Sequence, residues 1–170
     1  AFDVIRRRRD ELALVMIEGV QSSNPQPEAG EFLRELASVC RENGVPFMID
    51  EVITGFRLAY GGAQMHYGVV PDLTCLGKVI GGGLPVGAYG GRADVMAMVA
   101  PSGPVYQAGT LSGNPMAMAA GIVTLRALAN EDVYRTLDAM GEQLAAGLRA
   151  AATQAEAHDV TVVQLGSMMT

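Results

Sequence analysis

The sequence predicts an α/β fold built on a mostly parallel sheet with helices on both faces. Short apolar runs of strand length alternate along the chain with segments whose apolar residues recur at helical spacing. The strand runs are apolar throughout, which is typical of strands that are covered on both faces. With 49% hydrophobic residues the chain is too apolar to be disordered. No uninterrupted apolar run reaches the roughly 18 residues of a membrane-spanning helix, so we expect no membrane association.

The first half of the chain is expected to form a strand–helix–strand unit after an N-terminal helix. The N-terminal segment is charged, and its four consecutive arginines suit a helix face in water. A loop rich in Ser, Asn and Pro follows the first strand, and Gly44 ends the second helix. The expected elements are a helix over 3–11, a strand over 12–17, a loop over 22–30, a helix over 31–43 and a strand over 45–49.

The second half is richer in glycine, and its strands are short apolar runs between glycine turns. Its first helix has small residues behind an Asn-Pro start, and its second is long and amphipathic. The expected elements are strands over 73–76, 86–89 and 160–165, a helix over 115–128 and a long helix beginning near Asn130. We therefore assign residues 1–129 to a large domain, and 130–170 to a linking helix and the start of a smaller α+β domain. Because the chain begins without Met and stops within a predicted strand, we expect it to be an internal segment of a longer protein.

The charge balance and the cysteines narrow the possible classes of function. Acidic residues outnumber basic ones by 18 to 12, which gives a net charge of −6. Nucleic-acid-binding proteins usually present a basic face, so we expect no nucleic-acid partner. Cys40 and Cys75 lie in apolar surroundings without metal-ligand spacing, so we interpret them as free thiols of a cytoplasmic protein and expect no metal site. Eleven of the basic residues are Arg, and the only lysine is Lys78.

Three ionisable residues follow predicted strands: Glu18, Asp50 and Lys78. In parallel sheets chemistry gathers beyond the carboxyl ends of the strands, so we expect the three to share one edge. Asp50 taken alone also fits a helix cap or a salt bridge, because a carboxylate at a buried strand end needs a partner. Lys78 stands in an apolar, glycine-rich setting, where desolvation favours the neutral amine that attacks carbonyl groups.

An amine nucleophile together with a carboxylate suits pyridoxal phosphate chemistry. The amine forms a Schiff base with the cofactor aldehyde, and the carboxylate keeps the pyridine nitrogen protonated. The glycines at 81–83 also suggest a phosphate cradle, but they lack Walker and dinucleotide spacing. Residues 103–115 place small residues and hydroxyls before a helix start, which suits a phosphate. Ordinary capping by Ser112 or Asn114 explains the same residues, and spacing does not separate the two readings.

Two long ungapped motifs carry a family resemblance. The motif Asp-Glu-Val-Ile-Thr-Gly-Phe-Arg at 50–57 and the motif Gly-Lys-Val-Ile-Gly-Gly-Gly-Leu-Pro-Val-Gly at 77–87 resemble the signature of class III, fold-type I, pyridoxal-phosphate aminotransferases. The segments 61–64, 71–74 and 103–115 resemble the branch of aminomutases that move an amino group within one small amino-aldehyde substrate in tetrapyrrole biosynthesis. The resemblance extends from about residue 11 to residue 168. It implies an enzyme with pyridoxal 5'-phosphate as cofactor.

The resemblance also implies individual roles for residues that match the family motifs. Lys78 matches the Schiff-base lysine, which also moves protons between substrate and cofactor carbons. Asp50 matches the carboxylate paired with the pyridinium nitrogen, and Val52 matches the apolar residue packed under the cofactor ring. Thr110 matches the hydroxyl that binds the cofactor phosphate, usually that of the neighbouring subunit, with Gly109 allowing close backbone approach. We therefore expect a homodimer.

The residues that would bind the substrate match the family motifs less closely than the cofactor residues do. Glu18 matches a family glutamate near the cofactor and the substrate. Arg57 and Arg92 could each bind a substrate carboxylate, and Arg57 is favoured because it follows the cofactor motif. Gly19 replaces a proline of the family, and the stretch 21–23 is more similar to amine-transferring domains of polyketide and peptide synthetases. A class III aminotransferase with another amine, aldehyde or keto substrate is therefore the alternative to the aminomutase. An inactive chain that serves only dimerisation is a third possibility.

Overall fold

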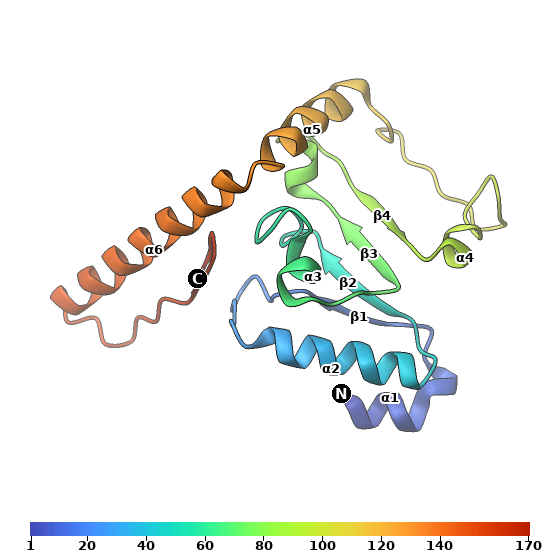
Figure 1. The fold of residues 1–170 in the computed structure, drawn as a ribbon, viewed down its shortest axis with the longest axis horizontal. Helices are drawn as coiled ribbons and strands as arrows, with labels where there is room; N and C mark the ends of the chain where they lie inside the picture. Colours follow the sequence, from blue (N-terminus) through green and yellow to red (C-terminus); the bar gives the residue numbers. More distant parts are fainter.

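A four-stranded sheet forms the centre of the fold in the computed structural model, which describes residues 1–170 (Figure 1). The strand order is β1-β2-β3-β4. The strands are β1 (Val15–Glu18), β2 (Phe47–Glu51), β3 (Leu73–Leu76) and β4 (Ala88–Gly91). β1, β2 and β3 are parallel, and β4 pairs antiparallel with β3 at one edge. The mostly parallel sheet that the sequence predicts is therefore confirmed.

The helices alternate with the strands as expected. The helical segments are α1 (Phe2–Arg8), the 3-10 turn η1 (Arg9–Glu11), α2 (Ala29–Glu42), α3 (Gly62–Tyr67), the 3-10 turn η2 (Lys78–Gly81), α4 (Ala93–Met96), α5 (Pro115–Leu128) and α6 (Glu131–Gln154). The four main helices, α1, α2, α5 and α6, lie where the sequence predicts them, whereas α3, η2 and α4 are short additions. None of the helices combines the length and the apolar character that crossing a lipid bilayer requires.

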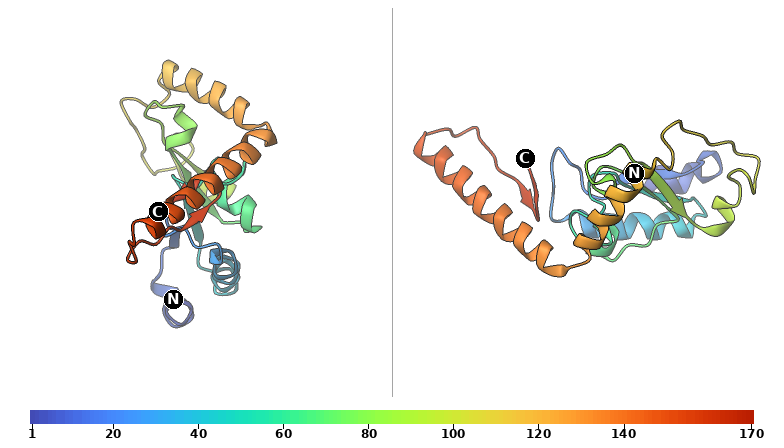
Figure 2. Two further views of the ribbon diagram at one scale, coloured as in Figure 1. Left: turned by 90° about the vertical axis from the view of Figure 1, so that its left-hand side faces the viewer. Right: turned by 90° about the horizontal axis from the view of Figure 1, so that it is seen from above.

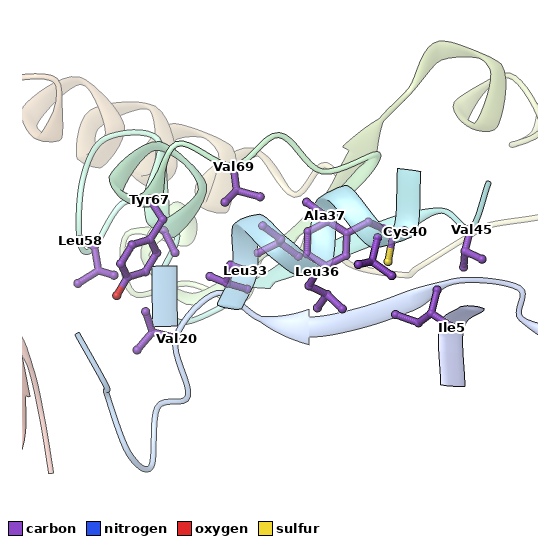
Figure 3. Close-up of a cluster of buried hydrophobic side chains, with 14 of the residues drawn as sticks. Ile5, Val20, Leu33, Leu36, Ala37, Cys40, Val45, Leu58, Tyr67 and Val69 are labelled. Atoms are coloured by element: carbon purple, nitrogen blue, oxygen red, sulfur yellow. The ribbon is translucent and has the colours of Figure 1, made fainter. Parts of the chain in front are cut away.

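The hydrophobic core lies on one face of the sheet, under α2 (Figure 3). Along β2 every second side chain is buried, so Phe47 and Ile49 point into this core. α2 contributes Leu33 and Leu36, and α1 packs beside α2 through Ile5 (Figure 1). Burial of one such aliphatic side chain contributes about 1.5–3 kcal/mol. The two helices and the sheet therefore hold one another through a shared apolar layer.

The opposite face of the sheet is open in this chain, whereas the sequence predicts helices on both faces. Met48 and Asp50, which alternate with the core positions of β2, are half-buried, and Met16 on β1 is 51% exposed. The register pairs Met16 with Met48 and Glu18 with Asp50, so these side chains share that face. The helical cover of the central strands comes from α2 and α3 on the core face. The open face is therefore where ionisable side chains meet solvent.

The edge strand lies two residues later than the sequence predicts, at 88–91 in place of 86–89. Its last residue, Gly91, has φ of 154° and lies so close to the carbonyl of Asp72 that no Cβ would fit. The amide of Arg92 then donates to the same carbonyl at 2.9 Å. A close backbone approach of this kind selects glycine within a strand, although glycine has poor strand propensity.

The C-terminal segment forms a hairpin where the sequence predicts a single strand over 160–165. β5 (Gln164–Leu165) and β6 (Met168–Met169) pair antiparallel around Gly166, which has φ of 55°. Met168 is buried in the same core cluster as α2, and the Thr170 hydroxyl donates to the carbonyl of Ser22 at 3.2 Å. The hairpin thus returns to the first part of the chain, whereas α6 projects away from the sheet (Figure 2).

A change of direction between α5 and α6 falls at the predicted start of the linking helix. The side chain of Asn130 caps α6 by accepting the amide of Asp132 at 3.0 Å. The hydroxyl of Tyr134 in the first turn donates to the carbonyl of Phe56 at 3.3 Å, which ties α6 to the turn after β2. The division into residues 1–129 and 130–170 stays a prediction.

Candidate active site

A row of four side chains crosses the open face of the sheet. The strand register aligns, in strand order, Glu18, Asp50, Cys75 and Tyr89. Adjacent strands lie about 4.8 Å apart, and residues paired in register point to the same face. Two of the predicted site residues, Glu18 and Asp50, are therefore neighbours, as their positions at strand ends suggest.

Asp50 is held by a local turn. Its Oδ1 accepts the backbone N–H of Val52 at 2.8 Å, and no ion pair of the structure includes it. The structure thus supports neither the helix cap nor the salt bridge that Asp50 could have made. Because Oδ2 receives no protein N–H, it is available to a donor that approaches from the open face.

Lys78 lies two residues past the end of β3, with its amine free. Its side chain is exposed and takes part in no ion pair or hydrogen bond, so the desolvation expected from its apolar neighbours is not seen in this chain. Its φ is +47°, a conformation that costs a non-glycine residue about 1–3 kcal/mol and that occurs preferentially at functional sites. A Cβ on Gly77 would lie 3.3 Å from a methyl group of Val52. Val52 therefore packs against the backbone that presents Lys78.

The glycine-rich loop after Lys78 is shaped by its contact with α5. Gly82 has φ of +58°, and a Cβ there would lie 2.5 Å from the hydroxyl of Thr124 and 2.8 Å from the carbonyl of Ala120. In return, Gly121 of α5 leaves room for the carbonyl of Ile80. At Gly82 the glycine is thus required by backbone-to-backbone packing, and α5 forms the support of the lysine loop.

The start of α5 is capped by its own side chain. Asn114 Oδ1 accepts the amides of Met116 at 3.0 Å and Ala117 at 3.3 Å. These N–H groups are therefore satisfied within the chain, and the capping reading holds for them. A phosphate at this helix start would need the same two amides as donors, and neither is free.

Gly109 and Thr110 lie apart from the Asp50–Lys78 edge. The carbonyl of Gly109 accepts the amide of Ser112 at 2.9 Å, which forms a tight turn that leaves Thr110 exposed. A depression of about 410 Å³ separates this turn from Pro85–Gly87, and neither Asp50 nor Lys78 lines it. Figure 1 shows the segment 101–114 running beyond the edge strand β4. Within one chain, the structure does not bring Thr110 to the other predicted site residues.

The two candidate arginines differ in availability. Arg92 forms ion pairs with Asp94 at 2.7 Å and Asp72 at 3.1 Å. The hydrogen bonds that the Arg92 guanidinium donates to Asp94 and Asp72 raise the pKa of Arg92, and the same guanidinium lowers the pKa of Asp94. Arg57 is half-buried and its side chain makes no ion pair or hydrogen bond. Arg57 is therefore the arginine that remains free to bind an anion.

Glu18 is exposed and accepts the amide of Ser22 at 3.0 Å.

Three residues with a place at this site are absent from the sequence-based prediction. Cys75 and Tyr89 belong to the cross-sheet row, and only the strand register could have found them. Burial and the nearby charge of Asp50 raise the pKa of the Cys75 thiol. Glu51 is fully buried beneath the row. The alternation of Phe47 with later β2 residues is the signal that could have placed Glu51 in the core.

The chain matches the aminotransferase class-III family over residues 1–170. The chain belongs to this family. It is 56% identical to a glutamate-1-semialdehyde 2,1-aminomutase of Desulforudis audaxviator, over 98% of this chain and 39% of that protein. Among solved structures it is similar to a β-phenylalanine aminotransferase of Variovorax paradoxus, with a TM-score of 0.86 and 39% identity over 99% of this chain and 39% of the other. A transaminase with PLP bound gives a TM-score of 0.84 and 34% identity over 96% of this chain and 39% of the other. The chain therefore spans about two fifths of the length of these relatives.

Class III aminotransferases are pyridoxal-phosphate enzymes, and the residues of the open face fit this cofactor. Lys78 offers an unpaired amine beyond the end of β3. Asp50 offers an oxygen that no protein N–H occupies, which is what a protonated pyridine nitrogen would need. Val52 offers an apolar surface next to Gly77. The phosphate-binding part of the fit depends on Gly109 and Thr110, which lie elsewhere in the chain.

Proposed function

We propose that this chain is part of a pyridoxal-phosphate enzyme that moves an amino group within glutamate-1-semialdehyde to give 5-aminolevulinate. The observation that carries the proposal is the free amine of Lys78 beside a sheet edge where Asp50 keeps one oxygen without an N–H partner. The 56% identity to a glutamate-1-semialdehyde 2,1-aminomutase supports this choice of substrate.

Each residue has a defined task in this proposal. When bound, pyridoxal phosphate supplies an aldehyde that condenses with an amine and a ring that withdraws electrons. Lys78 holds the cofactor through its amine and carries protons between the two reacting carbons. Asp50 holds the ring nitrogen in its protonated state, and Val52 packs against one face of the ring. One lysine can serve both proton transfers because the reacting groups are held in place beside it.

Arg57 and Glu18 are the substrate-binding residues of the proposal. A guanidinium binds a carboxylate through two parallel hydrogen bonds, and Arg57 has no acidic partner within the chain. Glu18 lies next to Asp50 in the cross-sheet row, on the exposed side of β1. A small substrate with one carboxylate, an aldehyde and an amine suits this distribution of charge.

We further propose a homodimer in which Thr110 and Gly109 serve the cofactor phosphate of the neighbouring subunit. The position of their turn away from Asp50 and Lys78 supports a role at a second site. The free thiols Cys40 and Cys75 suit a reducing compartment such as the cytoplasm.

The alternative function is a class III aminotransferase that takes its amine from a separate donor. Two observations favour it: the β-phenylalanine aminotransferase of Variovorax paradoxus is structurally similar, and the loop after Glu18 departs from the family pattern at Gly19. A Cβ on Gly19 would lie 2.5 Å from the Ala63 side chain, so this loop is fitted closely to α3. Both functions share the cofactor chemistry and differ in the source of the amino group.

The cofactor assignment is tested by reductive labelling of the natural polypeptide that contains this chain. Borohydride treatment of the cofactor-loaded protein should fix the label on Lys78, and Lys78→Ala should abolish it. Lys78→Arg is the matched control, because it keeps a positive charge without a reactive amine and should also remain unlabelled. Label on another residue would refute the assigned role of Lys78.

The substrate assignment is tested by supplying glutamate-1-semialdehyde without any other amino donor. The aminomutase should form 5-aminolevulinate in many turnovers per active site. Absence of 5-aminolevulinate under these conditions would favour the alternative aminotransferase. Arg57→Ala should raise KM for the substrate at least tenfold, whereas Arg92→Ala should leave KM close to the wild-type value.

A further inference from the structure

Glu51 is a carboxylate buried beneath the cross-sheet row of Glu18, Asp50, Cys75 and Tyr89, and none of the roles described above uses it. Its side chain has 0% exposure, on the core face of β2. Oε2 accepts the hydroxyl of Thr54 and the amide of Ala63, the latter at 2.9 Å. Oε1 accepts the amide of Gln64 at 2.8 Å. A buried carboxylate is costly unless hydrogen bonds compensate for lost water, and these three donors supply that compensation.

The fit around Glu51 is close, which shows that the carboxylate has a fixed position. A Cβ on Gly62 would lie 2.5 Å from Oε2 and 2.7 Å from Oε1, so α3 begins in contact with the carboxylate. The side-chain amide of Gln64 reaches both Glu51 Oε1 at 3.4 Å and the hydroxyl of Thr74 at 3.3 Å. The network thus joins the end of β2, the start of α3 and the middle of β3.

The same network lies next to Asp50 and Val52, and it reaches the strand that leads to Lys78. Asp50 precedes Glu51 on β2, and Val52 follows it in the turn that Thr54 closes onto the carboxylate. The amide of Gly55 donates to the Glu51 carbonyl at 2.8 Å, so the turn is held at the backbone as well. On β3, Thr74 lies four residues before Lys78.

We propose that Glu51 is a positioning residue: its carboxylate fixes the turn that aims Asp50 and Val52 at the cofactor and sets the spacing of β2 and β3 below Lys78. This inference rests on the proposed function. Glu51 itself, on the opposite face of the sheet from Asp50, does not touch the cofactor or the substrate.

The central variant is Glu51→Gln, which keeps the shape and replaces one acceptor oxygen by a donor. Whichever oxygen is replaced, the amide of either Ala63 or Gln64 loses its acceptor. At metal sites the loss of a supporting hydrogen bond typically costs about 10–100-fold in affinity or activity. We expect a loss of pyridoxal-phosphate affinity of the same order, together with a shifted pH titration of the absorbance of the bound cofactor.

A second readout needs no cofactor. In the cofactor-free protein, the pH profile of Cys75 alkylation reports on Asp50, because the Asp50 charge contributes to the raised pKa of that thiol. If the turn relaxes and Asp50 moves away, the profile of Glu51→Gln should shift to lower pH. Mass-spectrometric mapping distinguishes Cys75 from the buried Cys40.

Two controls separate positioning from a general loss of stability. Ile5→Ala removes core packing at the contact between α1 and α2, far along the chain from the turn, and should lower the melting temperature without changing either profile. Thr54→Ser keeps the hydroxyl that reaches Glu51 and should behave as wild type, whereas Thr54→Val should reproduce the effect of Glu51→Gln. The Thr54 pair also serves if Glu51→Gln fails to fold.

The outcomes distinguish this inference from the proposed function. Unchanged cofactor and alkylation profiles in Glu51→Gln and Thr54→Val would overturn the positioning role, as would equal shifts in Ile5→Ala. Wild-type protein that carries no borohydride label on Lys78 would overturn the proposed function instead. In that case the Cys75 profile still decides whether Glu51 holds Asp50 in place.

Discussion

Replacing Gly62 by Ala tests how tightly the Glu51 carboxylate is packed, and Gly68 provides a matched control. Gly62 begins α3 with φ of +69°, and Gly68 caps the same helix with φ of +67°. In this left-handed region an alanine costs about 1–2 kcal/mol more than glycine. The two positions differ in space: nothing lies within 4 Å of a Cβ on Gly68, whereas a Cβ on Gly62 would lie 2.5 Å from Glu51 Oε2.

The magnitudes follow from that difference. Gly68→Ala should destabilise the fold by about 1 kcal/mol, because the smaller entropy of the unfolded alanine chain offsets part of the strain. Gly62→Ala adds an overpacking cost of about 1–3 kcal/mol and disturbs hydrogen bonds to the carboxylate. We therefore expect Gly62→Ala to destabilise the fold by about 2–4 kcal/mol.

Urea unfolding of the two variants and wild type under identical conditions measures this difference through the transition midpoints. Glu51→Ala with Gly62→Ala in one chain gives a further check, since removal of the carboxylate should relieve part of the added cost. Equal losses for Gly62→Ala and Gly68→Ala would show that backbone strain alone accounts for both, and would refute the close packing of Glu51.

The other predictions concern α5, the core and the thiol of the cross-sheet row. Asn114→Ala should destabilise the fold by about 1 kcal/mol because the helix cap is lost. Asn114→Asp keeps a capping side chain and should have a stability close to that of wild type, as measured by thermal unfolding. Leu33→Ala should cost about 2–5 kcal/mol in urea unfolding, because the site is fully buried; a loss below 1 kcal/mol would contradict that burial. Alkylation of Cys75 in cofactor-free protein should reach its half-maximal rate at a higher pH than for a free cysteine, because burial and Asp50 raise its pKa. Asp50→Asn should shift that profile to lower pH, and an unchanged profile would contradict the effect of the Asp50 charge.

The order of elements and the residues at strand ends could be read from the sequence. β3 and the helix α5 have the predicted limits, because each has a strong local signal at one end. Gly77 follows β3, and the Asn114-Pro115 pair starts α5. Limits that depend on other segments were wrong by a few residues. β4 shifted onto Gly91 because the backbone of Asp72 approaches it, and the final strand became a hairpin that packs against the core.

The residues of the site divide in the same way. Asp50 and Lys78 could be selected because a carboxylate and a unique lysine after apolar strands are local features of the chain. Arg57 could be preferred over Arg92 only weakly from sequence, whereas the structure adds that Arg92 is already paired with Asp72 and Asp94.

The sequence by itself determined that this chain is an α/β protein, and it singled out a lysine and a carboxylate that follow two of the strands. Hydrophobic periodicity and turn residues act over a few positions, so they are visible in one dimension. Only the tertiary structure decided that Cys75 and Tyr89 join Asp50 in one row, that Glu51 is buried below the row, and that Thr110 lies apart from it. These relations depend on strand register and on backbone contacts between segments more than ten residues apart. Such contacts stabilise the fold only after the distant segments have come together, so they leave no local signal in the sequence.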